Sequence, residues 1–129
     1  MDSGDYIELL LLARQAGAGS AMNFVALVFA YLVMVYFVGT RLTVLQICLV
    51  SAVYTLFLVF PMNGAIQDFR TTNALAAEFH ANFPDEATKY IAETPTMWQF
   101  FVGAAIAAWL ISIVFAVDTR RSATSVEDA

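Results

Sequence analysis

The stretch "FVALVFAYLVMVYFV", residues 24–38, decides the fold class because it is apolar on every side. A helix of a soluble protein would show a polar face at every turn. This stretch lies in a charge-free window, 15–40, and two more such windows follow at 42–67 and 94–117. Each is longer than the roughly 20 apolar residues that a helix needs to cross a hydrocarbon core. Backbone groups in the hydrocarbon core cannot bond to water, so a spanning segment must be a helix or a strand of a closed barrel. The windows lack the alternation of polar and apolar residues of a barrel strand, so they predict membrane-spanning helices.

Composition supports the same class of protein. Hydrophobic residues make up 60% of the chain and charged residues only 13%, against roughly 25% in soluble domains. A soluble bundle with three fully buried helices would need polar surface that 129 residues cannot supply. The opening "MDSGDYIE" is acidic, whereas a secretory signal begins with basic residues, so we expect the first hydrophobic segment to remain in the membrane.

Punctuating residues divide the chain, which we expect to form a single all-α membrane domain, 1–129. The "AGAGS" segment, 16–20, predicts a break after a short N-terminal helix that lies in the membrane interface. The few residues of "GTRLT" predict a tight hairpin, with Gly39 as a left-handed helix cap. The predicted segments are an interfacial helix (5–16), spans one, two and three (22–38, 42–60 and 96–117), an extracytoplasmic cap (61–95) and a disordered tail (118–129).

The cap between the second and third spans is the long polar stretch of the chain. Pro61 either ends the second span or kinks it and lets it continue into the cap. Apolar residues then recur at helical spacing between polar ones, which predicts an amphipathic helix. This face is expected to cover the membrane surface, the N-terminal helix or another protein. Its residues are Ile66, Phe69, Leu75, Phe79 and Phe83.

Uncharged polar side chains occur within the first two spans. Folding the hairpin about its turn puts Tyr31 at the depth of Ser51, and Tyr36 at that of Gln46. A hydrogen bond between helices in lipid contributes about 0.6 kcal/mol on average. Helix packing is therefore favoured over a polar permeation path for the whole set, which comprises Tyr31, Tyr36, Gln46, Ser51, Tyr54 and Thr55.

The third span carries small residues at four-residue spacing, which lets helix backbones approach closely in lipid. Packing on the hairpin of the same chain is favoured over packing on a partner. The small residues are Gly103, Ala104, Ala107, Ala108, Ser112 and Ala116. A bulky face is expected to meet lipid or a second surface, and it comprises Phe101, Ile106, Trp109, Leu110, Ile113 and Phe115.

Residues capable of chemistry are few. No ionisable side chain lies deep within a span, which argues against a proton pump or secondary transporter. His80 has no second histidine with which to form a zinc site, and Cys48 lies in an apolar segment without a nearby base. The sequence therefore predicts no catalytic, cofactor or metal site, and no basic patch for nucleic acid.

Arginines close to the membrane predict the orientation. Arg41, Arg120 and Arg121 lie at one end of the three spans, next to the apolar segments, which favours a cytoplasmic location for that end and an external N-terminus. We expect a protein of the bacterial inner membrane that is a non-catalytic accessory or self-assembling component, in contact with the lipid bilayer and with itself or another membrane protein. The alternatives are a homo-oligomeric channel or small-solute carrier, and a lipid-handling subunit of a membrane enzyme.

Overall fold

The computed structural model describes residues 1–90 and 97–128, and within them the chain is helical. The helices are α1 (Ser3–Val38), α2 (Val44–Asn82), α3 (Pro84–Tyr90) and α4 (Met97–Glu127). Three of them, α1, α2 and α4, are long and apolar enough to cross a membrane. The predicted all-α architecture with three candidate spans is confirmed.

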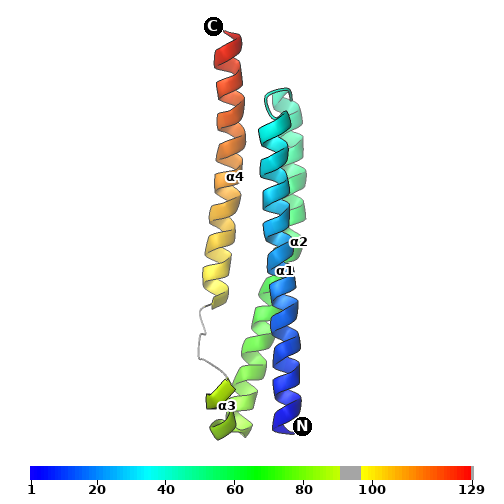
Figure 1. Ribbon diagram of the computed structural model, residues 1–129, viewed down its shortest axis with the longest axis vertical. Helices are drawn as coiled ribbons and strands as arrows, with labels where there is room; N and C mark the ends of the chain where they lie inside the picture. The colour runs from blue at the N-terminus through cyan, green and yellow to red at the C-terminus, as the bar shows by residue number, and fades with distance from the viewer. Residues whose placement is uncertain (91–96, 129) are drawn as a thin grey trace.

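The first two helices form a long antiparallel hairpin that sets the shape of the molecule (Figure 1). Helix α4 begins part-way along this hairpin, packs against both helices and ends beyond the hairpin turn. Helix α3 folds back on the end of α2 at the opposite end of the molecule.

Helix α1 runs without interruption through the "AGAGS" segment, so the predicted break at 16–20 and the separate helix over 5–16 are wrong. It begins with a capping box in which Asp2 and Asp5 each accept a hydrogen bond from the other's backbone N–H. The glycines lower helix propensity, but Gly17 is buried against Asp68 and Phe69 of α2. Small residues there allow the two backbones to approach closely, and this tertiary packing outweighs local propensity.

Helix α2 continues through Pro61 and ends only at Asn82, so of the two possibilities for Pro61 the continuing helix is the one observed. Neighbouring helices and local adjustments allow proline inside long membrane helices. The 36 residues of α1 and the 39 of α2 correspond to about 54 and 58 Å of helix, against about 30 Å of hydrocarbon. Each helix is therefore about 24 to 28 Å longer than the hydrocarbon core is thick, and residues 61–82 of the predicted cap are the last part of α2.

Two further predictions about helix ends fail. Gly39 does cap α1, but with φ −57° and ψ −34° it is right-handed. A β-carbon at this position would collide with the carbonyl oxygen of Val35, so glycine is needed for close approach. The tail predicted to be disordered from residue 118 continues α4 to Glu127, because nothing in 118–127 interrupts the helical hydrogen bonds. The predicted end of the cap at residue 95 and the predicted start of the third span at residue 96 both lie in 91–96, outside the described residues.

Two buried clusters hold the described residues together. One lies at the depth of the spans and joins α1, α2 and α4; its buried members are Phe24, Tyr31, Val35, Tyr54, Leu58, Ala105 and Ala116. The other lies in the part of the hairpin that projects beyond the spans; its members are Tyr6, Leu10, Phe79 and Ala87. The two clusters define the two places where functional side chains can be positioned.

Candidate functional site

Aromatic and hydroxyl side chains meet where the three long helices converge. The rings of Tyr31 on α1 and Tyr54 on α2 are stacked, with centroids 3.9 Å apart and an interplanar angle of 7°. The hydroxyl of Tyr31 lies 2.7 Å from that of Ser51, so the hydrogen bond that depth matching predicted is present. The alternative pair is not formed: Tyr36 is exposed, and the side chain of Gln46 instead accepts from the backbone of Thr43 at the start of α2.

Helix α4 joins this junction through two more hydrogen bonds. Tyr54 Oη donates to Ser112 Oγ at 3.2 Å, and Ser112 is fully buried. Trp109 Nε1 donates to Thr55 Oγ1 at 2.9 Å. Ser112 and Thr55 in turn donate to backbone carbonyls one turn earlier on their own helices. Each of these hydroxyls has a hydrogen-bond partner inside the bundle, as expected of groups that join packed helices.

The sequence did not predict the two bonds to α4. Trp109 was assigned to a face turned away from the hairpin, together with Ile113 and Phe115, yet all three pack against the inner cluster. The assignment was wrong because no charged residue in the third span marks one face as outward. Ser112 itself offered the signal, since a hydroxyl in an apolar helix must find a partner.

The small residues of α4 divide between two faces. Ala108, Ser112 and Ala116 face the hairpin, as predicted, and Ala105 takes the buried position that was expected for Ala104. Three of the predicted packing residues are instead exposed, and they are Gly103, Ala104 and Ala107. A β-carbon on Gly103 would meet nothing within 4 Å. The predicted small residues are therefore divided between a face of α4 that packs on the hairpin and a face that remains exposed.

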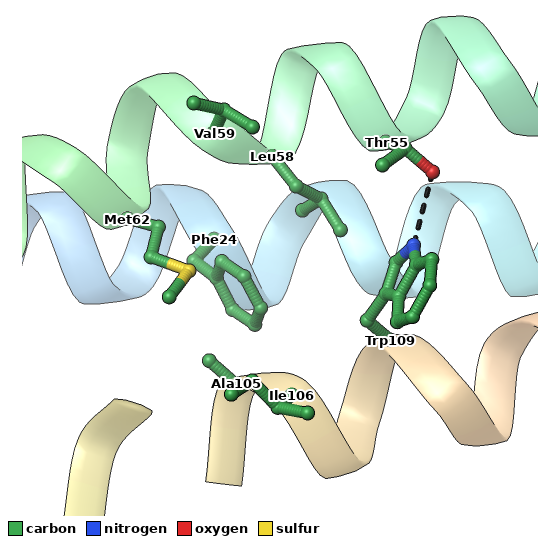
Figure 2. Close-up of a pocket in the computed structure, with 8 residues that line it drawn as sticks. All are labelled: Phe24, Thr55, Leu58, Val59, Met62, Ala105, Ile106 and Trp109. Atoms are coloured by element: carbon green, nitrogen blue, oxygen red, sulfur yellow. Dashed lines mark hydrogen bonds between the residues drawn. The ribbon is translucent and has the colours of Figure 1, made fainter. Parts of the chain in front are cut away.

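A cavity of about 240 Å³ lies beside the junction, between the hairpin and α4 (Figure 2). Its wall is apolar apart from Thr55, whose hydroxyl is already engaged by Trp109. The lining residues are Phe24, Thr55, Leu58, Val59, Met62, Ala105, Ile106 and Trp109. With no ionisable group in its wall, the cavity could hold a hydrocarbon group but could not transfer a proton.

The apolar face of the cap packs against the N-terminal part of α1. Phe79 is fully buried and stacks on Tyr6, with ring centroids 5.6 Å apart. Phe83 meets the edge of the same tyrosine, and Leu75 packs beside them. Among the surfaces that this face could have covered, α1 is the one it contacts.

The remaining residues of that face lie closer to the spans. Phe69 touches Gly17 of α1 and lies 5.7 Å, centroid to centroid, from Phe101 of α4. Phe101 also meets the edge of Phe24, so it was wrongly placed on an outward face. Ile66 is half-buried. Phe69 thus links the projecting part of the hairpin to the first turns of α4.

Tyr6 is the polar centre of the cap. Its hydroxyl donates to Glu78 Oε1 at 2.9 Å and accepts from Asn82 Nδ2 at 3.0 Å. The hydrogen bond to Glu78 raises the pKa of Tyr6 above 10.0; burial and the charge of Glu78 also raise it, and the bond from Asn82 opposes them. A carboxylate and an amide on one helix thus hold a phenol from the other.

The raised pKa predicts that the cap weakens in alkali. Because the folded-state pKa exceeds the unfolded value, the stabilisation is complete below about pH 10 and is lost as pH rises through the folded-state pKa. Thermal unfolding followed by circular dichroism should give wild type a higher melting temperature than Tyr6→Phe at pH 8, and the difference should shrink as the pH is raised above 10. A difference that stays constant with pH would contradict this assignment.

The titratable residues elsewhere do not assemble into a centre. Within the described ranges, histidine, cysteine and carboxylate side chains form no group of three that could hold a metal ion. Cys48 lies on α2 with its side chain exposed. No family model, curated protein or solved structure matches the chain. Function has to be inferred from the chain's own residues.

Proposed function

We propose that this integral membrane protein is a non-catalytic, self-assembling component whose helix α4 associates through its outer face. The observation that supports the proposal is the second small-residue face. Gly103 and Ala107 lie opposite Ala105 and Ser112 on α4, and they stay exposed when the helix packs on its own hairpin. In lipid, apolar side chains gain little from association, whereas small residues four apart allow close backbone contact between helices.

The surroundings of this pair favour a helical partner. Ile111 and Val114 continue the same face and are each 65% exposed. Small residues at one end and branched ones at the other would give a second helix a groove followed by a ridge. A second copy of this chain brings that same surface, so a two-fold symmetric pair of α4 helices is the simplest assembly.

Substitution of Ala107 by leucine tests the proposal. We expect Ala107→Leu to weaken association at least tenfold, about 1.4 kcal/mol, because the side chain would hold the backbones apart. Association would be measured by energy transfer between labelled copies as the protein is diluted in lipid vesicles. Ala52→Leu is the matched control, since Ala52 is also exposed but lies on α2.

Two results would overturn the proposal. One is a wild-type protein that remains monomeric at the highest protein-to-lipid ratio. The other is an equal loss of association in Ala107→Leu and Ala52→Leu, which would show that added bulk anywhere on the lipid-facing surface has the same effect. Circular dichroism of both variants would verify that the helices are intact.

We also propose the orientation and location. Arg41, Arg120 and Arg121 lie just beyond the apolar segments at the hairpin-turn end, which supports a cytoplasmic position for that end in a bacterial inner membrane. The cap of α1, α2 and α3 would then project outside. Cysteines introduced at Ser3 and Ser125 should react with an impermeant reagent in intact cells at position 3 alone.

A further inference from the structure

At the hairpin turn, an arginine of α4 contacts the backbone directly before a second arginine. Arg120 Nη1 on α4 donates to the carbonyl oxygen of Thr40, 3.1 Å away, and Thr40 is followed directly by Arg41. Consecutive Cα atoms are about 3.8 Å apart. The guanidinium of Arg120 is thereby fixed beside the backbone that carries Arg41.

These positive charges lack neutralising partners among the described residues. No carboxylate of residues 1–90 or 97–128 lies within 4.0 Å of either guanidinium, and Arg120 Nε is buried without a hydrogen-bond partner. Asp118, two residues from Arg120 on α4, lines the neighbouring pocket together with Thr40, Tyr36 and Phe37, and it forms no ion pair with either arginine. Glu127 and Asp128 lie about 10 Å further along the helix axis, close to one screening length away.

The turn also lies at the depth where lipid headgroups would be. Val38 ends α1, and Val117 is the last residue of the charge-free window in α4. One turn deeper, Tyr36 and Phe37 are 68% and 69% exposed, as expected for aromatic side chains at the boundary of the bilayer. Arg41 and Arg120 are therefore placed among phosphate groups rather than in bulk water or hydrocarbon.

We propose that Arg41 and Arg120 bind the phosphate of an anionic phospholipid at the hairpin turn. A guanidinium presents paired N–H donors that match phosphate oxygens. A phosphate has more acceptor oxygens than a carboxylate, so it is the better ligand for two guanidinium groups. The positive end of the α2 dipole, which starts at Val44, adds to the attraction. The exposed aromatic pair lies where the acyl chains of that lipid begin.

Lipid retention by the purified full chain tests the proposal. Native mass spectrometry would compare binding of phosphatidylglycerol with that of zwitterionic phosphatidylcholine in the same detergent. Loss of one basic side chain at a membrane surface should weaken anionic lipid binding roughly fivefold. We expect that loss in Arg41→Gln, and a larger loss in Arg41→Gln with Arg120→Gln. Binding of phosphatidylcholine should not change.

Matched controls are available at the other end of the molecule. Arg14→Gln and Arg70→Gln remove the same charge from exposed positions on the projecting part of the hairpin. They should leave phosphatidylglycerol binding unchanged. Arg41 has no side-chain hydrogen bond within the described residues, so Arg41→Gln tests the site without disturbing the fold even if Arg120→Gln weakens the hairpin.

Three outcomes would overturn the proposal. The first is wild-type affinity for phosphatidylglycerol in Arg41→Gln and in the double variant. The second is an equal loss in Arg14→Gln, which would show an effect of net charge rather than of a site. The third is displacement of the lipid by equimolar inorganic phosphate, which would show a site for a free anion.

Discussion

Substitution of Phe79 by alanine is expected to lower the free energy of unfolding of the cap by about 3 to 5 kcal/mol. Phe79 is fully buried, stacks on Tyr6 and lies in the cluster that joins α2 and α3 to α1. In the proposed topology this cluster lies outside the bilayer, where water surrounds it and the hydrophobic effect drives burial of the ring. Hydrogen exchange should show faster exchange over 3–12 and 76–90, with the spans unchanged.

A phenylalanine on the lipid-facing surface provides the control. Phe60 is on the same helix and 75% exposed, so Phe60→Ala should change stability by roughly 0.5 kcal/mol or less. If Phe79→Ala exchanged no faster than Phe60→Ala in the cap, the contact between α1 and the end of α2 would not be what holds these segments together.

The spans could be predicted from the sequence because charge is excluded from hydrocarbon at high energetic cost. The windows between Arg14, Arg41 and Asp68 bound the parts of α1 and α2 that can cross a membrane. The bond between Tyr31 and Ser51 was also predictable, because a short turn fixes which residues share a depth. Both inferences rest on distances along a helix.

The lengths of the helices could not be predicted in the same way. Glycines at 16–20 and a proline at 61 indicate breaks by local propensity, yet both lie inside helices. Tertiary packing decides these cases: Gly17 and Gly64 lie where α1 and α2 approach closely, and a β-carbon on Gly64 would be 3.3 Å from Ser20 Oγ. A single amino-acid sequence contains no direct signal of which helix a glycine packs against.

The faces of α4 show a related limit. Periodicity identified small and bulky residues at helical spacing, but a helix surrounded by lipid carries no polar face to orient it. The sequence therefore predicted Trp109 on the outer face and Ala104 on the packed face, whereas Trp109 packs on the inner cluster and Ala104 is exposed. The cap was easier to interpret, since polar residues marked its solvent side and left Phe79 and Phe83 as the face to be covered.

Gly17→Leu is expected to open the crossing of α1 and α2, at a cost of about 1 to 3 kcal/mol. A β-carbon at Gly17 would lie 3.6 Å from Cβ of Asp68 and 3.7 Å from the ring of Phe69, so it fits, whereas the longer leucine side chain would displace Phe69. Because Phe69 also contacts Phe101, the displacement would loosen the first turns of α4. Unfolding in mixed micelles, followed by circular dichroism, measures the loss.

Smaller and displaced substitutions separate overpacking from helix propensity. Gly17→Ala meets its neighbours at ordinary contact distance and gains up to about 1 kcal/mol of helix propensity, so it should be neutral or stabilising. Gly19→Leu adds the same bulk as Gly17→Leu at a position with nothing within 4 Å, and should not destabilise. Equal losses from leucine at 17 and 19 would mean that α1 and α2 do not cross closely at Gly17. Destabilisation by Gly17→Ala would instead mean that α1 and α2 lie closer together at Gly17 than the 3.6 Å between the added β-carbon and Cβ of Asp68 indicates.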